Sequence, residues 1–184
     1  MVRKKKQNLI KFTGQLGFSG IFSKILSLPH SIIYAKFLMP SGFGVLQIFK
    51  VIISYFGYTQ MGMLQAVTRN VPKAYANNNF EKSKNIKDIA FTWLFSLTVI
   101  GLFFLWTIYF LNDEFSSKLD LNYLIMLTFI IIVSQLNNFM KPILKAEGEF
   151  DIIGKVALIN SLSSSIIGIF LVLLFSLEGA LLAL

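Results

Sequence analysis

Several residue types are scarce in this chain of 184 residues, and each scarcity excludes a class of function. Cysteine is absent and histidine occurs once, which excludes a disulfide framework and a thiolate metal site. The nine acidic residues lie between or at the ends of the apolar stretches, so no carboxylate pair is placed for acid–base catalysis. Neither a P-loop nor a GxSxG motif occurs. We therefore expect no enzyme activity, no metal site and no cofactor.

Charge is also scarce, whereas apolar residues are abundant. Charged residues make up 14% of the chain, against about 25% in soluble domains. Hydrophobic residues make up 55%, phenylalanine alone occurs 19 times, and the mean hydropathy is +0.68. Apolar runs of about 20 residues recur, which is the length that crosses the hydrocarbon core of a bilayer. A soluble helical core does not explain these runs, so we predict an all-α integral membrane protein.

The apolar runs predict five full transmembrane helices and the start of a sixth. The expected helices are 12–37, 43–67, 89–111, 123–140 and 156–177, with the sixth beginning at 179. Between them we expect a tight turn at 39–42, a polar connection at 69–88, an acidic loop at 112–122 and an interfacial amphipathic loop at 141–155. The final residues, 180–184, are too few to span a membrane. We therefore favour a fragment that stops at the start of the sixth helix over a frayed tail.

The basic residues predict the orientation. With the N-terminus inside, 13 of the 17 lysines and arginines fall in cytoplasmic segments, namely 1–11, 69–88 and 141–155. This asymmetry follows the positive-inside rule. Residues 1–11 are then a cytoplasmic tail rather than a signal peptide, because no small-residue cleavage site follows them. The net charge of +8 is thus explained by topology, and we expect no nucleic acid as partner.

Two of the apolar runs contain a lysine, and each lysine lies on a polar stripe at helical spacing. Lys24 lies near mid-span, where a charge costs about 2.5–3.5 kcal/mol, while Lys50 lies about 9 Å from the outer end of its helix. We predict that both helices line a basic aqueous cleft. The candidate lining residues are Lys24, Lys50, Ser27, Ser31, Gln47 and Ser54. Two alternatives remain open: close helix packing by the small residues, and snorkelling of Lys50 to the interface.

The single histidine, His30, follows Pro29 in the first expected helix. An unperturbed histidine titrates near pH 6.5, so His30 is a candidate pH-sensitive switch. The alternative is a histidine that is simply hydrated at the outer interface.

Three segments resemble motifs of one family. Residues 35–44 (AKFLMPSGFG) resemble the turn after the first helix of polysaccharide flippases, and residues 62–72 (GMLQAVTRNVP) resemble the end of their second helix. Residues 141–150 (KPILKAEGEF) resemble the loop after their fourth helix. The order and spacing of the three segments match. The chain therefore resembles the lipid-linked oligosaccharide flippases of the multidrug/oligosaccharidyl-lipid/polysaccharide exporter superfamily.

This resemblance implies that residues 1–184 form the N-terminal helical bundle of a two-bundle exporter fold. It implies alternating access around a cationic cavity, in which Lys24 and Lys50 contact a polyprenyl-diphosphate-linked oligosaccharide moving to the outer leaflet for surface polysaccharide assembly. The implied location is the plasma or inner membrane. The implied partners are this substrate, membrane lipids and a polysaccharide polymerase complex.

Other functions remain as alternatives. A cation-coupled drug exporter of the same superfamily is expected to carry acidic residues inside its first bundle. A membrane glycosyltransferase or polymerase is expected to carry catalytic carboxylates in a sizeable loop. An inactive truncated product is the last alternative.

Overall fold

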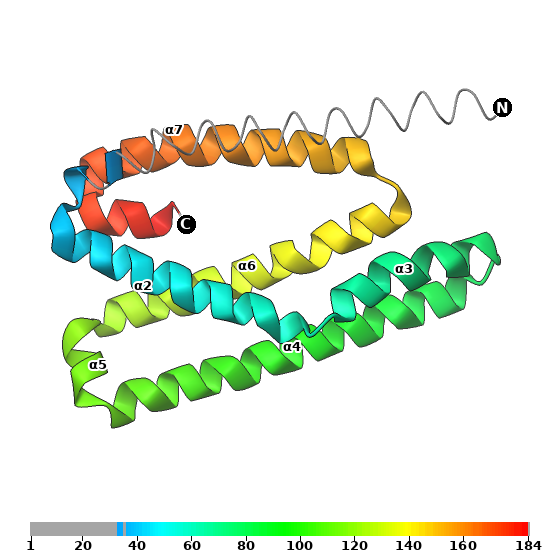
Figure 1. Cartoon of the computed structure of the whole chain (residues 1–184), viewed down its shortest axis with the longest axis horizontal. Helices are drawn as coiled ribbons and strands as arrows, with labels where there is room; N and C mark the ends of the chain where they lie inside the picture. Colours follow the sequence, from blue (N-terminus) through cyan, green and yellow to red (C-terminus); the bar gives the residue numbers. More distant parts are fainter. Residues whose placement is uncertain (1–32, 35, 184) are drawn as a thin grey trace. The chain divides into compact units, whose positions relative to one another are not determined.

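The computed structural model describes residues 33, 34 and 36–183, and these residues form helices joined by short connections (Figure 1). No strand occurs among them. In chain order the elements are α2 (Met39–Gly57), the 3₁₀ turn η1 (Tyr58–Gln60), α3 (Met63–Ala76), α4 (Phe80–Leu111), α5 (Asp113–Lys118), α6 (Leu121–Glu147) and α7 (Phe150–Leu182). Of the expected first helix, residues 33, 34, 36 and 37 are described, and all four are helical.

Four helical segments of the described chain are long and apolar enough to cross a membrane. They are 39–60, 80–111, 121–147 and 150–182. At 1.5 Å per residue each reaches about 30 Å or more, the thickness of the hydrocarbon core. These segments indicate a membrane protein, as the composition predicts.

The chain divides into two compact units. The first unit combines residues 1–46 with residues 148–184, and the second unit is residues 47–147. The boundaries therefore fall within α2 and in the connection between α6 and α7.

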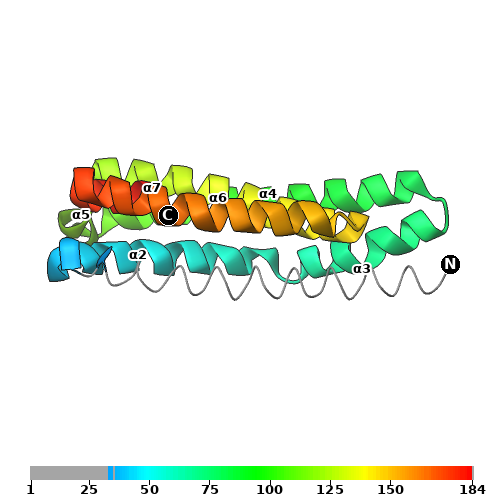
Figure 2. The ribbon, with the colours of Figure 1, turned by 90° about the horizontal axis from the view of Figure 1, so that it is seen from above.

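In the second unit, α3 and the start of α4 form a tight helical hairpin (Figures 1 and 2). The turn is 77–79, where Asn78 adopts a left-handed φ of 54° and the Asn79 side chain caps α4 by accepting the Lys82 N–H at 2.9 Å. Asparagine adopts the left-handed conformation more readily than most residues other than glycine, and it is also among the preferred N-cap residues. The expected polar connection at 69–88 is therefore wrong, because the asparagines reverse the chain in a short turn instead of forming a long loop.

The hairpin packs against α6 through an apolar core. Residues 64, 67, 71 and 74 of α3 are buried at alternating steps of three and four, so they share one helix face. The core comprises Leu64, Val67, Val71, Ala90, Leu94, Phe139 and Ala146, drawn from α3, α4 and α6. This core explains why α3 is a helix although it is too polar for a membrane span.

The expected helix at 43–67 is broken in the structure. Met61 and Gly62 have left-handed φ values of 42° and 79°, and they separate α2 and η1 from α3. The buried Gln135 of α6 donates from Nε2 to the Phe56 carbonyl at 2.5 Å, and Thr59 Oγ1 donates to the same oxygen at 2.7 Å. These bonds satisfy a carbonyl at the break, which an apolar environment requires.

Two further expected boundaries are wrong. The expected end of a helix at 140 fails because Pro142 lies inside α6, which continues to Glu147 and ends before Gly148 with φ 82°. A proline removes one helical hydrogen bond but need not end the helix. The expected loop at 141–155 is thus two helix ends around a short turn.

The expected acidic loop at 112–122 contains the short helix α5. Asn112 caps the N-terminus of this helix, because its side chain accepts a hydrogen bond from the Phe115 N–H at 3.1 Å.

In the first unit, α2 begins within the segment that was expected to form a turn. The turn predicted at 39–42 lies instead at 38–39, where Met39 has φ 54°. Pro40 occupies the first turn of α2, where its missing N–H costs little.

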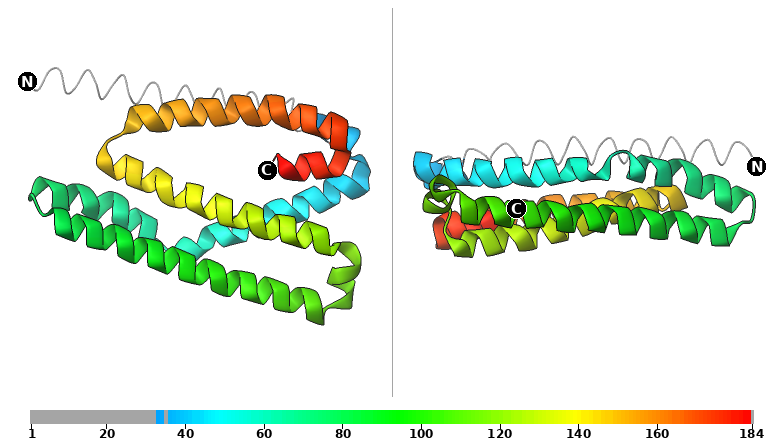
Figure 3. Two further views of the ribbon diagram at one scale, coloured as in Figure 1. Left: turned by 180° about the vertical axis from the view of Figure 1, so that it is seen from behind. Right: turned by 90° about the horizontal axis from the view of Figure 1, so that it is seen from below.

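The helix α7 of the same unit reverses its direction near its C-terminal end. The reversal is at Ser176 (φ 51°, ψ −117°), and the following residues fold back as a helix (Figures 1 and 3). The reversal lies before the expected start of a new run at 179.

Candidate functional site

A hollow of about 330 Å³ opens on the surface of α2 around Lys50. It is lined by Lys50, Val51, Ser54, Tyr55 and Tyr58. Lys50, Ser54 and Tyr58 follow one another at steps of four, so their side chains leave the same side of the helical segment. We call this the Lys50 hollow. It combines one cation, three hydroxyl groups and two aromatic rings. The rings are those of Tyr55 and Tyr58, and their centroids lie 6.4 Å apart.

Lys50 lies close to the middle of its apolar segment. Because α2 begins at Met39 and not at residue 43, Lys50 is about 16 Å from the start of the helix, against about 9 Å expected from the sequence. A lysine side chain does not bridge such a distance to the interface. Snorkelling to the end of the helix therefore requires a longer side chain than lysine has, and the cavity around Lys50 stays a prediction.

The structure places the predicted site residues unequally. Lys50 and Ser54 line one hollow, whereas Gln47 is half-buried on α2 and does not line it. Lys24, Ser27, Ser31 and His30 lie outside the described residues. The sequence interpretation missed Tyr55 and Tyr58. Tyr58 follows Lys50 by eight residues, and this spacing is the signal that places both side chains on the same side of the helix.

No carboxylate neutralises Lys50 among the side chains that the structure describes. Within this part of the chain, the one ion pair joins Lys87 of α4 to Glu147 of α6. Nor do the described residues contain a group of three histidine, cysteine, aspartate or glutamate side chains that would hold a metal ion. A basic hollow without a carboxylate attracts anions rather than cations.

The ion pair of Lys87 belongs to a second polar cluster that ties the hairpin to α6. Lys87 Nζ also donates to the Tyr75 hydroxyl at 3.0 Å, and that hydroxyl lies 3.4 Å from Glu147 Oε1. The hydrogen bond from Lys87 lowers the pKa of Tyr75 below its usual value of 10. We assign this cluster a structural role, because it joins α3, α4 and α6 at the edge of their apolar core.

Comparisons with known protein families, with curated proteins and with solved structures find no match for this chain.

Proposed function

We propose that the chain serves in a membrane transporter that moves a polyprenyl-diphosphate-linked oligosaccharide from the inner to the outer leaflet. The observation that carries the proposal is the Lys50 hollow, a cationic site near the middle of an apolar helix. A lysine at that depth costs about 2.5–3.5 kcal/mol, and such residues commonly mark substrate pathways.

The chemistry of the hollow suits this substrate. The Lys50 ammonium can pair with a diphosphate oxygen, and the Ser54, Tyr55 and Tyr58 hydroxyls can donate to the remaining oxygens or to sugar hydroxyls. The two exposed tyrosine rings offer apolar faces for a sugar ring or for the prenyl chain. The motifs at 35–44, 62–72 and 141–150, which resemble those of polysaccharide flippases, support the same substrate class.

The proposal includes a topology. With the N-terminus in the cytoplasm, the hairpin of α3 and α4 and the C-terminal end of α6 are cytoplasmic, whereas α5 is outside. The basic residues of 69–88 and 141–155 then lie inside, in accordance with the positive-inside rule. The membrane is the plasma or inner membrane, where lipid-linked glycans are assembled on the cytoplasmic leaflet.

Replacing Lys50 by alanine is expected to weaken binding of a short-chain polyprenyl diphosphate by about tenfold or more, because one charge-assisted contact is lost. The measurement is a titration of the full chain in nanodiscs. Lys155→Ala is the matched control, because it removes an exposed lysine of α7 outside the hollow, and it is expected to leave the affinity within about twofold.

Equal affinities for the wild type and Lys50→Ala would contradict the proposal. The same titration with a lipophilic organic cation tests the alternative of a drug exporter. Saturable binding of that cation, undiminished by Lys50→Ala and without binding of the diphosphate, would favour the alternative.

A further inference from the structure

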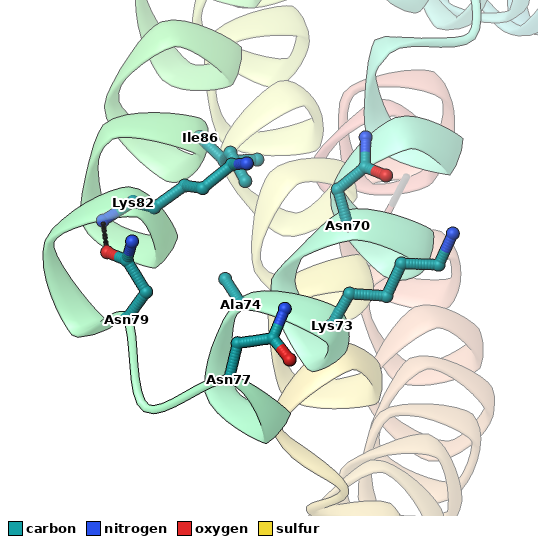
Figure 4. A pocket seen from close by; sticks show the side chains of 7 residues that line it. All are labelled: Asn70, Lys73, Ala74, Asn77, Asn79, Lys82 and Ile86. Atoms are coloured by element: carbon teal, nitrogen blue, oxygen red, sulfur yellow. Dashed lines mark hydrogen bonds between the residues drawn. The ribbon is translucent and has the colours of Figure 1, made fainter.

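A second hollow, of about 500 Å³, lies between α3 and α4 at the closed end of their hairpin (Figure 4). We call it the hairpin hollow. Its apolar floor is formed by Ala74 and Ile86, and its polar lining by Asn70, Lys73, Asn77, Asn79 and Lys82. Its volume is within the range of small-molecule sites. The lining thus presents two cations and three amides and contains no carboxylate.

The two lysines come from different helices. Lys73 belongs to α3 and Lys82 to the first turn of α4, and the asparagines lie on α3 and in the turn (Figure 4). The side chains that the structure describes include no ion-pair partner for Lys73 or Lys82, since the one ion pair there is that of Lys87 and Glu147. Two cations without partners on facing helices form an electropositive site, which an anion bridging them would stabilise.

The backbone of the hairpin adds to this potential. The hollow adjoins the N-terminus of α4, where the helix dipole is positive. The opposite, negative end of α3 is compensated, because three of its final carbonyls accept the N–H groups of residues 77–79. The acidic residue in the first turn of α4, Glu81, is exposed and does not line the hollow.

The hairpin hollow also has a suitable depth in the membrane. No charged residue follows Asp88 in α4, so the apolar stretch begins at Ile89, about 10 Å along the helix from Lys82. The headgroup layer outside the hydrocarbon core is roughly 5–8 Å thick on each side. Lys82 is therefore at or just outside the headgroup layer, and on the proposed topology the hollow opens at the cytoplasmic surface of the membrane.

We propose that the hairpin hollow binds a phosphate group, the chemistry shared by phospholipid headgroups and free phosphates. Lys73 and Lys82 contact the phosphate oxygens from opposite sides, and the Asn70 and Asn77 amides donate to them. The inference uses the membrane orientation proposed above, but it is independent of transport, because it involves neither Lys50 nor the movement of a substrate.

The test uses the full chain carrying Ala76→Cys, which the absence of native cysteine makes the only labelling position. Ala76 is exposed beside the hollow without lining it, so a dye attached there reports occupancy. In phosphate-free detergent the protein is titrated with inorganic pyrophosphate and, separately, with dihexanoyl phosphatidic acid. Lys73→Gln/Lys82→Gln is compared with Lys84→Gln/Lys145→Gln, which removes the same charge from exposed positions outside the hollow.

We expect a saturable dye response that Lys73→Gln/Lys82→Gln weakens by about tenfold or more and the control pair by less than about twofold. A response to both probes identifies the free phosphate as sufficient, and a response to phosphatidic acid alone identifies the lipid headgroup. Absence of saturable binding for both probes overturns the inference. So does an equal loss in the two double variants, because it would show a general attraction of anions to the basic surface.

Discussion

Replacing Phe139 by alanine is expected to lower the free energy of unfolding by about 3–5 kcal/mol. Phe139 is 5% exposed and lies where α3, α4 and α6 meet. Its ring contacts that of Phe91 edge to face, with centroids 5.2 Å apart. Truncation removes this contact and leaves a cavity between α3, α4 and α6. The cavity persists, because the three helices cannot all move inward to fill it. Equilibrium unfolding of the purified chain in mixed micelles, followed by circular dichroism, measures the change.

Phe129→Ala is the matched control, because it removes the same side chain from the same helix at a position that is 68% exposed. Its expected cost is about 0.5 kcal/mol or less. Similar losses for the two variants would show that Phe139 is not part of a packed core, and that the three-helix arrangement is wrong.

Cysteines at positions 76 and 116 are expected to react on opposite sides of the membrane. Ala76 ends α3 in the hairpin, and Ser116 lies in α5. The uncharged part of α4 between them, 89–111, is about 33 Å long and crosses the hydrocarbon core once. In intact spheroplasts an impermeant maleimide is expected to label Ser116→Cys fully and Ala76→Cys only after permeabilisation. The expected difference is therefore close to all or none.

The reverse pattern would invert the proposed orientation, because it would place the basic hairpin outside. Labelling of both positions from one side would show that α4 does not cross the membrane. The cysteine-free wild-type chain provides the background for both measurements.

Much of the helical architecture could be predicted from apolar runs. The end of α4 at Leu111 coincides with the predicted end at 111, because the apolar run stops there at polar Asn112. The hairpin of α3 and α4 was missed, because polar sequence was interpreted as a loop. The apolar positions of α3 recur at helical spacing. However, α3 is stabilised mainly by packing against α4, which follows it in the chain, and against α6, which is distant in sequence.

The break between α2 and α3 depends on a contact that no local pattern contains. Glycines at 57 and 62 are typical of helix ends, but the expected helix 43–67 runs through both of them. The partner that satisfies the freed Phe56 carbonyl, Gln135, lies 79 positions away on α6. Only the folded chain brings these groups together.

The candidate site could be predicted in part. Helical spacing correctly places Lys50 and Ser54 together, since both line the same hollow. Spacing alone did not identify which neighbours share the hollow, and so it included Gln47 and omitted Tyr55 and Tyr58. The depth of Lys50 depends on where α2 begins, and the sequence interpretation placed that start four residues too late.

The most direct test of the central claim is translocation by the full chain in liposomes that contain a fluorescent short-chain polyprenyl diphosphate. Dithionite bleaches only the outer leaflet, so the slow phase of bleaching reports movement from the inner leaflet. We expect the chain to make bleaching complete and Lys50→Ala to slow that phase by about tenfold, while Lys155→Ala preserves it. Bleaching that stops at the outer-leaflet fraction, as in protein-free liposomes, or equal rates for the wild type and Lys50→Ala, would contradict a transporter that works through the Lys50 hollow.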